Sequence, residues 1–222
     1  MKKQEVRSRI LEVGIVPVIR ASSAAEGKFA AEAVSRGGLP IVEITMTVPG
    51  AIEVISELVR DLPEVLVGAG TVLDADTARR CLDAGASFLV SPGLDLDTVK
   101  LAVKESVLIM AGALTPTEVM AAWKAGADFV KIFPCAQVGG PAYIKALRGP
   151  LPQVPLVPTG GVNLETAAAF ISAGAAALGV GGELIRKDLL QSRRADVLED
   201  LTRKFVGVVR EARRTLTVAV RQ

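Results

Sequence analysis

The sequence predicts an α/β fold, a closed (β/α)8 barrel with an additional N-terminal helix. One phrase recurs four times: a helix that ends in glycine, a turn of small residues, and an apolar strand with a polar or glycine-rich end. Half of the residues are hydrophobic but only 4% are aromatic, so the interior must be built from Val, Ile, Leu and Ala. Eight candidate strands in a chain of this length favour the TIM-barrel architecture over an open doubly wound sheet.

The chain begins and ends with charged stretches that are predicted to be helices. Residues 2–13 are too evenly charged for a secretory signal and indicate an N-terminal helix. Residues 195–214 indicate the last barrel helix, with one solvated face. A length of 222 residues suits one well-buried core, so we expect a single domain over residues 1–222.

Apolar runs and amphipathic segments alternate between these two helices. The amphipathic segments are the candidate barrel helices and include 51–60, 74–84, 95–104 and 115–125. The apolar runs are the candidate strands: IVPVIR from 15, IVEITM from 41, LVGAGTV from 66, FLVSP from 88, VLIMAG from 107, FVKIFP from 129, LVPTGG from 156 and ALGVGG from 177.

The composition excludes several classes of partner. The 26 basic and 24 acidic residues are spread along the chain, so we expect no nucleic-acid partner. Residues 166–182 carry no charge but consist mostly of Ala and Gly, so we expect no membrane span. Cys81 and Cys135 provide neither a disulfide framework nor a metal-ligand spacing, which fits a reducing cytoplasm.

The absence of histidine limits the chemistry further. It excludes Ser-His-Asp and Cys-His machinery and zinc sites that need His ligands. Acid-base chemistry must then use carboxylates, Lys, Tyr, Cys or water. We expect no metal and no cofactor.

A lysine and a glutamate stand out at the predicted carboxyl ends of the strands, where barrel enzymes have their active sites. Lys131 lies between Val130 and Ile132 in an apolar strand, an unusual place for an ammonium group. A lysine in a dry pocket can become a free amine that attacks a carbonyl carbon and forms an imine. Glu43 is the carboxylate at this rim that could move the proton. The alternative is a structural ion pair between the two side chains.

Six phrases resemble the 2-keto-3-deoxy-6-phosphogluconate (KDPG) and 4-hydroxy-2-oxoglutarate (KHG) aldolase family. The resemblance runs from about residue 12 to the last barrel helix. It implies a barrel, usually a homotrimer, that cleaves KDPG reversibly to pyruvate and D-glyceraldehyde 3-phosphate through a Schiff base. The phrases are VEITMTVP (42–49), VGAGTVL (67–73), VSPGL (90–94), VKIFP (130–134), VPTGGVN (157–163) and GVGG (179–182).

The resemblance also implies roles for individual residues. Lys131 would form the imine, and Glu43 would be the general acid and base that works through a water. Thr71 would bind the carboxylate of the pyruvyl group. Pro92, Phe133 and Thr159 would shape the pocket.

Two positions depart from the family's pattern. Some members have an arginine at the position of Thr47 that holds the substrate carboxylate. We expect Arg20, at the end of the first strand, to supply that charge, with Thr47 in the same carboxylate-binding group. Gly182 stands where many members have a serine that contacts phosphate, and it keeps only the backbone donor.

Two glycine pairs follow the seventh and eighth strands, and each leads towards a helix. These pairs are Gly160-Gly161 and Gly181-Gly182. Loops at these two positions of a barrel often bind phosphate, because backbone N–H groups can approach the anion and a helix dipole favours it. Either pair alone would equally suit a tight turn, but the two together favour a phosphate site.

Three functions stay open on the sequence. The first is cleavage of KDPG, which Thr159 favours over the galactonate branch. The second is the same chemistry on KHG or on 2-keto-3-deoxy-6-phosphogalactonate. The third is a non-catalytic barrel that binds a sugar phosphate or serves assembly.

Overall fold

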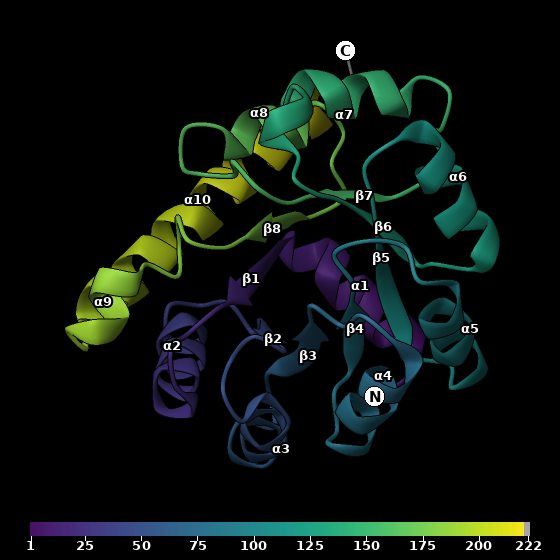
Figure 1. Ribbon diagram of the computed structural model, residues 1–222. Helices are drawn as coiled ribbons and strands as arrows, with labels where there is room; N and C mark the ends of the chain where they lie inside the picture. Colours follow the sequence, from purple (N-terminus) through teal and green to yellow (C-terminus); the bar gives the residue numbers. More distant parts are fainter. Residues whose placement is uncertain (220–222) are drawn as a thin grey trace.

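Eight parallel strands form a barrel at the centre of the molecule, and helices surround it (Figure 1). The structure is a computed structural model that describes residues 1–219. The strands pair in the order β7-β6-β5-β4-β3-β2-β1-β8, and a bridge between Thr159 and Gly179 joins the β7 and β8 segments. The predicted (β/α)8 barrel is therefore confirmed. Its strands are β1 (Ile15–Ile19), β2 (Ile41–Thr45), β3 (Leu66–Gly70), β4 (Phe88–Val90), β5 (Leu108–Ala113), β6 (Phe129–Ile132), β7 (Leu156–Pro158) and β8 (Leu178–Val180).

The helices follow the predicted order, with additions in the second half of the chain. The last helix continues to Ala219, beyond its predicted end. The short elements η1 and α9 were not predicted, because 3 and 5 residues are too few to show a hydrophobic period. None of the helices in residues 1–219 is long and apolar enough to cross a membrane. They are α1 (Lys3–Val13), α2 (Ala24–Arg36), α3 (Ala51–Asp61), α4 (Ala75–Asp83), α5 (Leu96–Lys104), α6 (Pro116–Ala125), the 3-10 helix η1 (Ala136–Val138), α7 (Pro141–Arg148), α8 (Ala167–Ser172), α9 (Lys187–Gln191) and α10 (Ala195–Ala219).

Side-chain caps fix where four of the barrel helices begin. In each case an oxygen of the residue before the helix accepts a hydrogen bond from the backbone N–H three residues later, which satisfies a donor that the helix leaves free. Each cap follows a strand by only a few residues, so it also limits the length of the loop at the rim. The capping residues are Ser23, Asp74, Asp95 and Thr115.

The interior is apolar at the amino end of the barrel and polar at the carboxyl end. Residues two apart on a strand share a face, so Phe129 and Lys131 both point inward, as do Ile41 and Glu43. Phe129 and Ile41 belong to an apolar cluster that fills the amino half, while Val130 and Ile132 pack outward against the helices. Lys131 and Glu43 are therefore buried on the inner face of the barrel.

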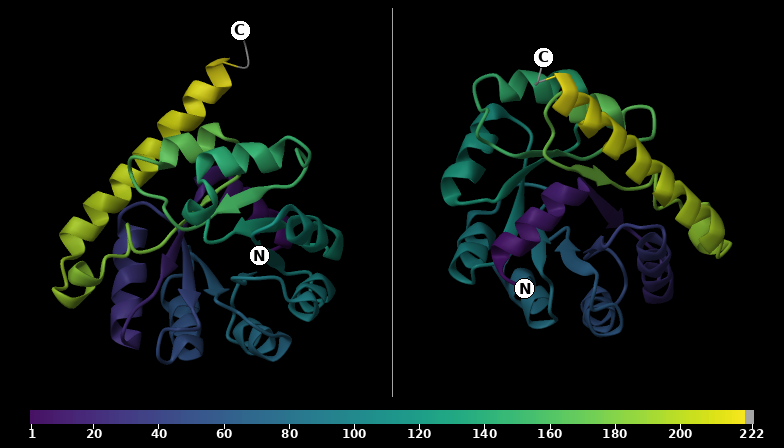
Figure 2. Two further views of the ribbon diagram at one scale, coloured as in Figure 1. Left: turned by 45° about the horizontal axis from the view of Figure 1, so that its top comes forward. Right: turned by 180° about the vertical axis from the view of Figure 1, so that it is seen from behind.

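Helix α1 covers the amino end of the barrel, as the right view of Figure 2 shows. It adds Val6 and Ile10 to the apolar cluster. Its first residue, Lys3, forms an ion pair of 2.9 Å with Asp128, the residue before β6, and Asp128 also accepts a hydrogen bond of 2.9 Å from the N–H of Ile109. Water is thus kept from the cluster on this side.

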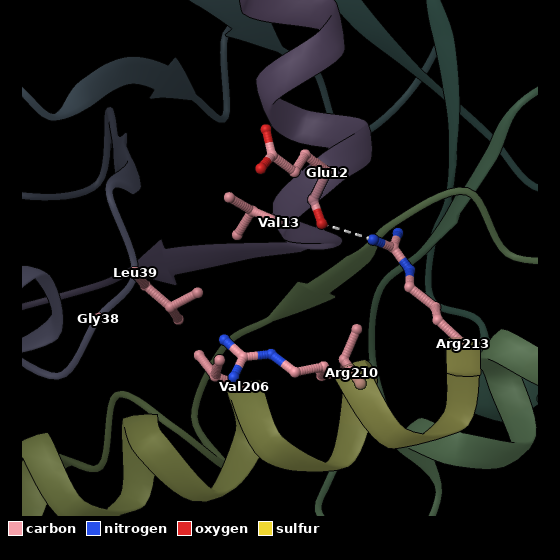
Figure 3. Close-up of a pocket in the computed structure, with 8 residues that line it drawn as sticks. Glu12, Val13, Gly38, Leu39, Val206, Arg210 and Arg213 are labelled. Atoms are coloured by element: carbon pink, nitrogen blue, oxygen red, sulfur yellow. Dashed lines mark hydrogen bonds between the residues drawn. The ribbon is translucent and has the colours of Figure 1, made fainter. Parts of the chain in front are cut away.

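Arg213 connects the last helix to the amino end of the barrel. Its guanidinium group donates hydrogen bonds to the backbone oxygens of Leu11 (2.6 Å) and Glu12 (2.7 Å), at the end of α1, and of Ala176 (2.9 Å), before β8. Figure 3 shows the side chain reaching from α10 to the last turn of α1, beside a cavity of about 270 Å³. A side chain at Gly14 would collide with this group, since its Cβ would lie 2.4 Å from Arg213 Nη2.

Replacing Arg213 with Met should destabilise the fold. Three backbone oxygens would lose a charged donor, at a cost on the order of 2–4 kcal/mol in the free energy of unfolding. Denaturant titration followed by circular dichroism measures this cost. Arg214→Met is the matched control, because Arg214 pairs with Glu211 on the exposed side of the same helix, and its midpoint should stay close to that of the wild type. Equal midpoints for the two variants would contradict the role given to Arg213.

Candidate active site

Lys131 and Glu43 are both buried inside the barrel, on strands that are not neighbours. Lys131 is in β6 and Glu43 in β2, and each residue is 2% exposed. The charge of Lys131 acts on the Glu43 carboxyl group, and the Lys131 Nζ lies 5.4 Å from the centre of the Phe133 ring. An amine and a carboxyl group thus share one buried region near the carboxyl ends of the strands.

One carboxyl oxygen of Glu43 is buried and available to accept a hydrogen bond. Within residues 1–219, Oε1 of Glu43 has no hydrogen-bond partner. The pKa of Glu43 is raised, because burial disfavours the charged form more than the nearby charges of Lys131 and Arg20 favour it. A carboxyl group with a raised pKa exchanges its proton closer to neutral pH, which suits a general acid or base. A purely structural ion pair between Lys131 and Glu43 would not explain why this oxygen has no hydrogen-bond partner.

Gly70 makes room for the Glu43 carboxyl group. A Cβ atom built at Gly70, the last residue of β3, would lie 1.8 Å from Oε1 of Glu43. The carboxyl group therefore occupies space that any larger residue at position 70 would fill. Sequence reasoning gave Gly70 no role, although its place one residue before Thr71, at a strand end, was a signal.

Thr45 and Thr47 form a hydroxyl chain beside Glu43. Thr45 Oγ1 donates its single hydrogen to the backbone oxygen of Ile19 at 2.9 Å, and it lies 2.7 Å from Thr47 Oγ1. Thr47 must therefore donate to Thr45, and its own oxygen is left with lone pairs only. In this arrangement Thr47 can accept a hydrogen bond from a cation or a hydroxyl group. Thr47 and Arg20 line the same cavity.

Ser91 supports the loop that carries Pro92. Its hydroxyl donates to the backbone oxygen of Gly93 at 2.7 Å and accepts from the N–H of Gly112 at 3.1 Å, and the residue is 3% exposed. Thr71, at the end of the neighbouring strand, has a left-handed backbone with φ 57°, which is uncommon for a residue with a side chain. Sequence reasoning missed Ser91, although it precedes Pro92 in VSPGL.

A cavity of about 170 Å³, which we call the distal cavity, opens at the rim where β1, β6, β7 and β8 end. Arg20 lies beside the β8 loop, since a Cβ at Gly181 would be 3.8 Å from its Nη1. Thr71 and Pro92 do not line this cavity. The predicted site residues that do line it are Arg20, Phe133, Thr159, Gly160, Gly161, Gly181 and Gly182.

The loop after β8 offers free backbone donors to the distal cavity. The oxygen of Gly181 accepts from the N–H groups of both Leu184 (2.9 Å) and Ile185 (2.8 Å), so a helical turn begins at Gly181. In the part of the chain that the structure describes, the N–H groups of Gly182 and Glu183 have no backbone acceptor. Donors at the start of a helical turn favour an anion.

The described residues contain no group of three or more His, Cys, Asp or Glu side chains that could hold a metal ion. Cys81 and Cys135 are both buried, and burial raises the pKa of each thiol to about 11. Neither thiol is therefore activated as a nucleophile.

Comparison with known proteins decides the family. The model of the KDPG and KHG aldolase family matches residues 6–201. The chain belongs to this family. It is 32% identical, over 207 residues, to the 2-dehydro-3-deoxy-phosphogluconate aldolase of Haemophilus influenzae, a match that covers 93% of this chain and 98% of that relative.

Solved structures of aldolases and of a designed assembly have the same fold. The KDPG aldolase from Legionella pneumophila, with pyruvate captured as a covalent carbinolamine intermediate, superposes with a TM-score of 0.83 at 27% identity, over 89% of this chain and 96% of that chain. A cube-shaped cage, designed by fusing symmetric oligomeric domains, reaches a TM-score of 0.86 at 28% identity, over 95% of this chain and 77% of that chain.

The raised pKa of Glu43 predicts a pH dependence of stability in this family member. Relative to its ordinary value of 4.5, the folded state holds the proton more tightly than the unfolded state does. Ionisation therefore destabilises the wild type as the pH rises from about 4.5 through the higher folded pKa. Glu43→Gln lacks this loss, so its stability relative to the wild type should increase over that pH range.

Denaturant titrations at a series of pH values measure the difference between the two proteins. Glu165→Gln, at an exposed position, is the control for the loss of one carboxyl group. A Glu43→Gln difference that is flat, or that shrinks with rising pH, would contradict a raised pKa at Glu43.

Proposed function

We propose that the chain is a metal-independent class I aldolase that cleaves KDPG reversibly to pyruvate and D-glyceraldehyde 3-phosphate. The observation that carries the proposal is the buried pair of Lys131 and Glu43 in a member of this family, with one Glu43 oxygen free. The covalent carbinolamine with pyruvate in the Legionella relative supports an imine route.

The reaction follows from the chemistry of a buried amine. Lys131 Nζ adds to the C2 carbonyl of the substrate, and the resulting carbinolamine loses water to give a protonated imine. The C3–C4 bond then breaks: its electrons move to the imine as an enamine, and the C4 hydroxyl proton leaves as the aldehyde forms. Protonation of the enamine at C3 and hydrolysis of the imine release pyruvate and restore the amine.

Glu43 is proposed to move these protons through a water. Its position in the apolar interior supports this role, because a desolvated carboxyl group with a raised pKa both accepts and returns a proton readily. The free Oε1 is the atom that would bind the water. Glu43 would act first on the carbinolamine, then on the C4 hydroxyl, and finally on C3.

The two ends of the substrate are proposed to bind at different parts of the rim. Arg20 and Thr71 would hold the pyruvyl carboxylate, with Thr47 as an acceptor that orients Arg20. Pro92 and Phe133 would close the pocket around the imine. The glycine pairs Gly160-Gly161 and Gly181-Gly182 would bind the phosphate at the distal cavity, beside Thr159 of the pocket. The lining of that cavity by both glycine pairs supports the phosphate assignment, and Arg20, which lines it as well, would lie between the two ends of the substrate.

Borohydride trapping tests the covalent step. Pyruvate and borohydride should add one reduced adduct at Lys131, and Lys131→Ala should lose both the adduct and cleavage activity. Lys145→Ala, an exposed lysine of α7, is the control and should label like the wild type. Peptide mass mapping locates the adduct. An unmodified Lys131 in a complete map of the treated wild type would reject the imine mechanism.

We also propose that the aldolase is a homotrimer in the cytoplasm. The similarity to a symmetric oligomeric domain of a designed cage supports assembly. So do exposed large apolar side chains at Leu96, Val103 and Met120, on the neighbouring helices α5 and α6. Light scattering should give three times the chain mass of 23.1 kDa, and a monomer mass would refute the trimer. Fractionation of the host cell tests the location.

A further inference from the structure

The distal cavity contains a negative charge that a phosphate site does not need. Arg20 and Glu183 are the ionisable residues that line it, and all its other lining residues are neutral. Glu183 directly follows the Gly181-Gly182 pair and is exposed at the rim. In residues 1–219, the structure gives its carboxylate no hydrogen bond and no ion pair. Within these residues, the one cation and the one anion that line the cavity are not joined by a hydrogen bond or an ion pair.

Two other charged residues on this side of the rim have hydrogen-bond partners. Arg186 donates to both oxygens of Asp188, at 2.7 and 3.1 Å. The carboxylate of Glu26 accepts from the N–H and the hydroxyl of Ser22, at 2.9 and 2.7 Å. The charge of Glu183 contributes to raising the pKa of Arg186, after the larger effect of Asp188, but the hydrogen bonds of Arg186 go to Asp188.

Two opposite effects then act on the distal end of a substrate. The free N–H groups of Gly182 and Glu183 attract an anion. The carboxylate of Glu183 repels it, most strongly when a phosphate ester is a dianion, above its second pKa of about 6. A terminal hydroxyl group feels no such repulsion and can donate a hydrogen bond to the carboxylate.

We propose that Glu183 is a specificity-determining residue of the distal cavity. Its carboxylate weakens the binding of a phosphate dianion and accepts a hydrogen bond from an uncharged, hydroxylated tail. The enzyme therefore distinguishes phosphorylated from unphosphorylated 2-keto-3-deoxy acids less sharply than the glycine loops alone would allow. This inference rests on the proposed aldolase function, and it concerns which 2-keto-3-deoxy acids the distal cavity accepts.

Glu183→Gln tests the inference, because it removes the charge and keeps the size of the side chain. The measured quantity is the ratio of kcat/KM for KDPG to kcat/KM for 2-keto-3-deoxygluconate, its unphosphorylated analogue. At low ionic strength and about pH 8, the ratio should rise roughly three- to tenfold. At roughly 0.5 M salt, or at about pH 5.5, the rise should shrink, since screening and protonation of the phosphate both weaken the repulsion.

Glu165→Gln is the matched control. Glu165 lines the neighbouring cavity that also includes Glu183, but it does not line the distal cavity. Its ratio should stay within about twofold of the wild type, as expected for a more distant, screened charge. An unchanged or lowered ratio in Glu183→Gln, or an equal rise in both variants, would overturn the proposal.

A binding measurement keeps the result independent of catalysis. Titration calorimetry with inorganic phosphate at about pH 8 should give a Kd that is lower in Glu183→Gln than in the wild type, by roughly the same three- to tenfold factor. An unchanged phosphate Kd would reject the charge effect. If wild-type Lys131 cannot be trapped with pyruvate, the aldolase proposal fails, and this titration still decides the role of Glu183.

Discussion

A buried carboxyl group without a full set of partners is costly, and the barrel is arranged around one at Glu43. The glycine at position 70 leaves the space that the group occupies. The charges of Lys131 and Arg20 offset part of the cost, but burial still dominates and raises its pKa. An environment that penalises the carboxylate in this way also increases its affinity for a proton, so the same burial that costs stability prepares the group for proton transfer.

The two halves of the barrel carry different parts of this arrangement. The amino half is a continuous apolar cluster, closed by α1 and fixed to α10 through Arg213. The free energy gained by burying this apolar surface grows with its area, so it can offset the unfavourable burial of polar groups in the carboxyl half. The carboxyl half contains hydroxyl, amine and carboxyl groups with short, directed contacts, as in the chain from Ile19 through Thr45 to Thr47. Stability and chemistry are thus separated along the barrel axis.

Periodicity along the sequence was enough to predict the strands and most helices, because these depend on local repeats of two and 3.6 residues. The place of Lys131 and Glu43 near the carboxyl ends of their strands followed from the same pattern. The contact between Gly70 and Glu43, the support of Pro92 by Ser91 and the position of Glu183 beside the distal cavity could not be predicted. The first two depend on how closely neighbouring strands approach, β2 to β3 and β4 to β5, and the third depends on where the loop after β8 places the residue that follows its glycine pair. The family resemblance supplied the proposed roles of Thr71 and Pro92, which no local pattern indicated.

The junction between β7 and β8 has a consequence for the whole molecule. Residues Thr159 and Gly179 make the bridge between these segments, and the two glycine loops of the distal cavity extend from the same strands. A ligand bound by both loops would connect β7 to β8 at the junction that closes the barrel. A ligand that binds only the closed barrel shifts the equilibrium towards the closed form. The substrate would therefore stabilise the closed barrel of the enzyme.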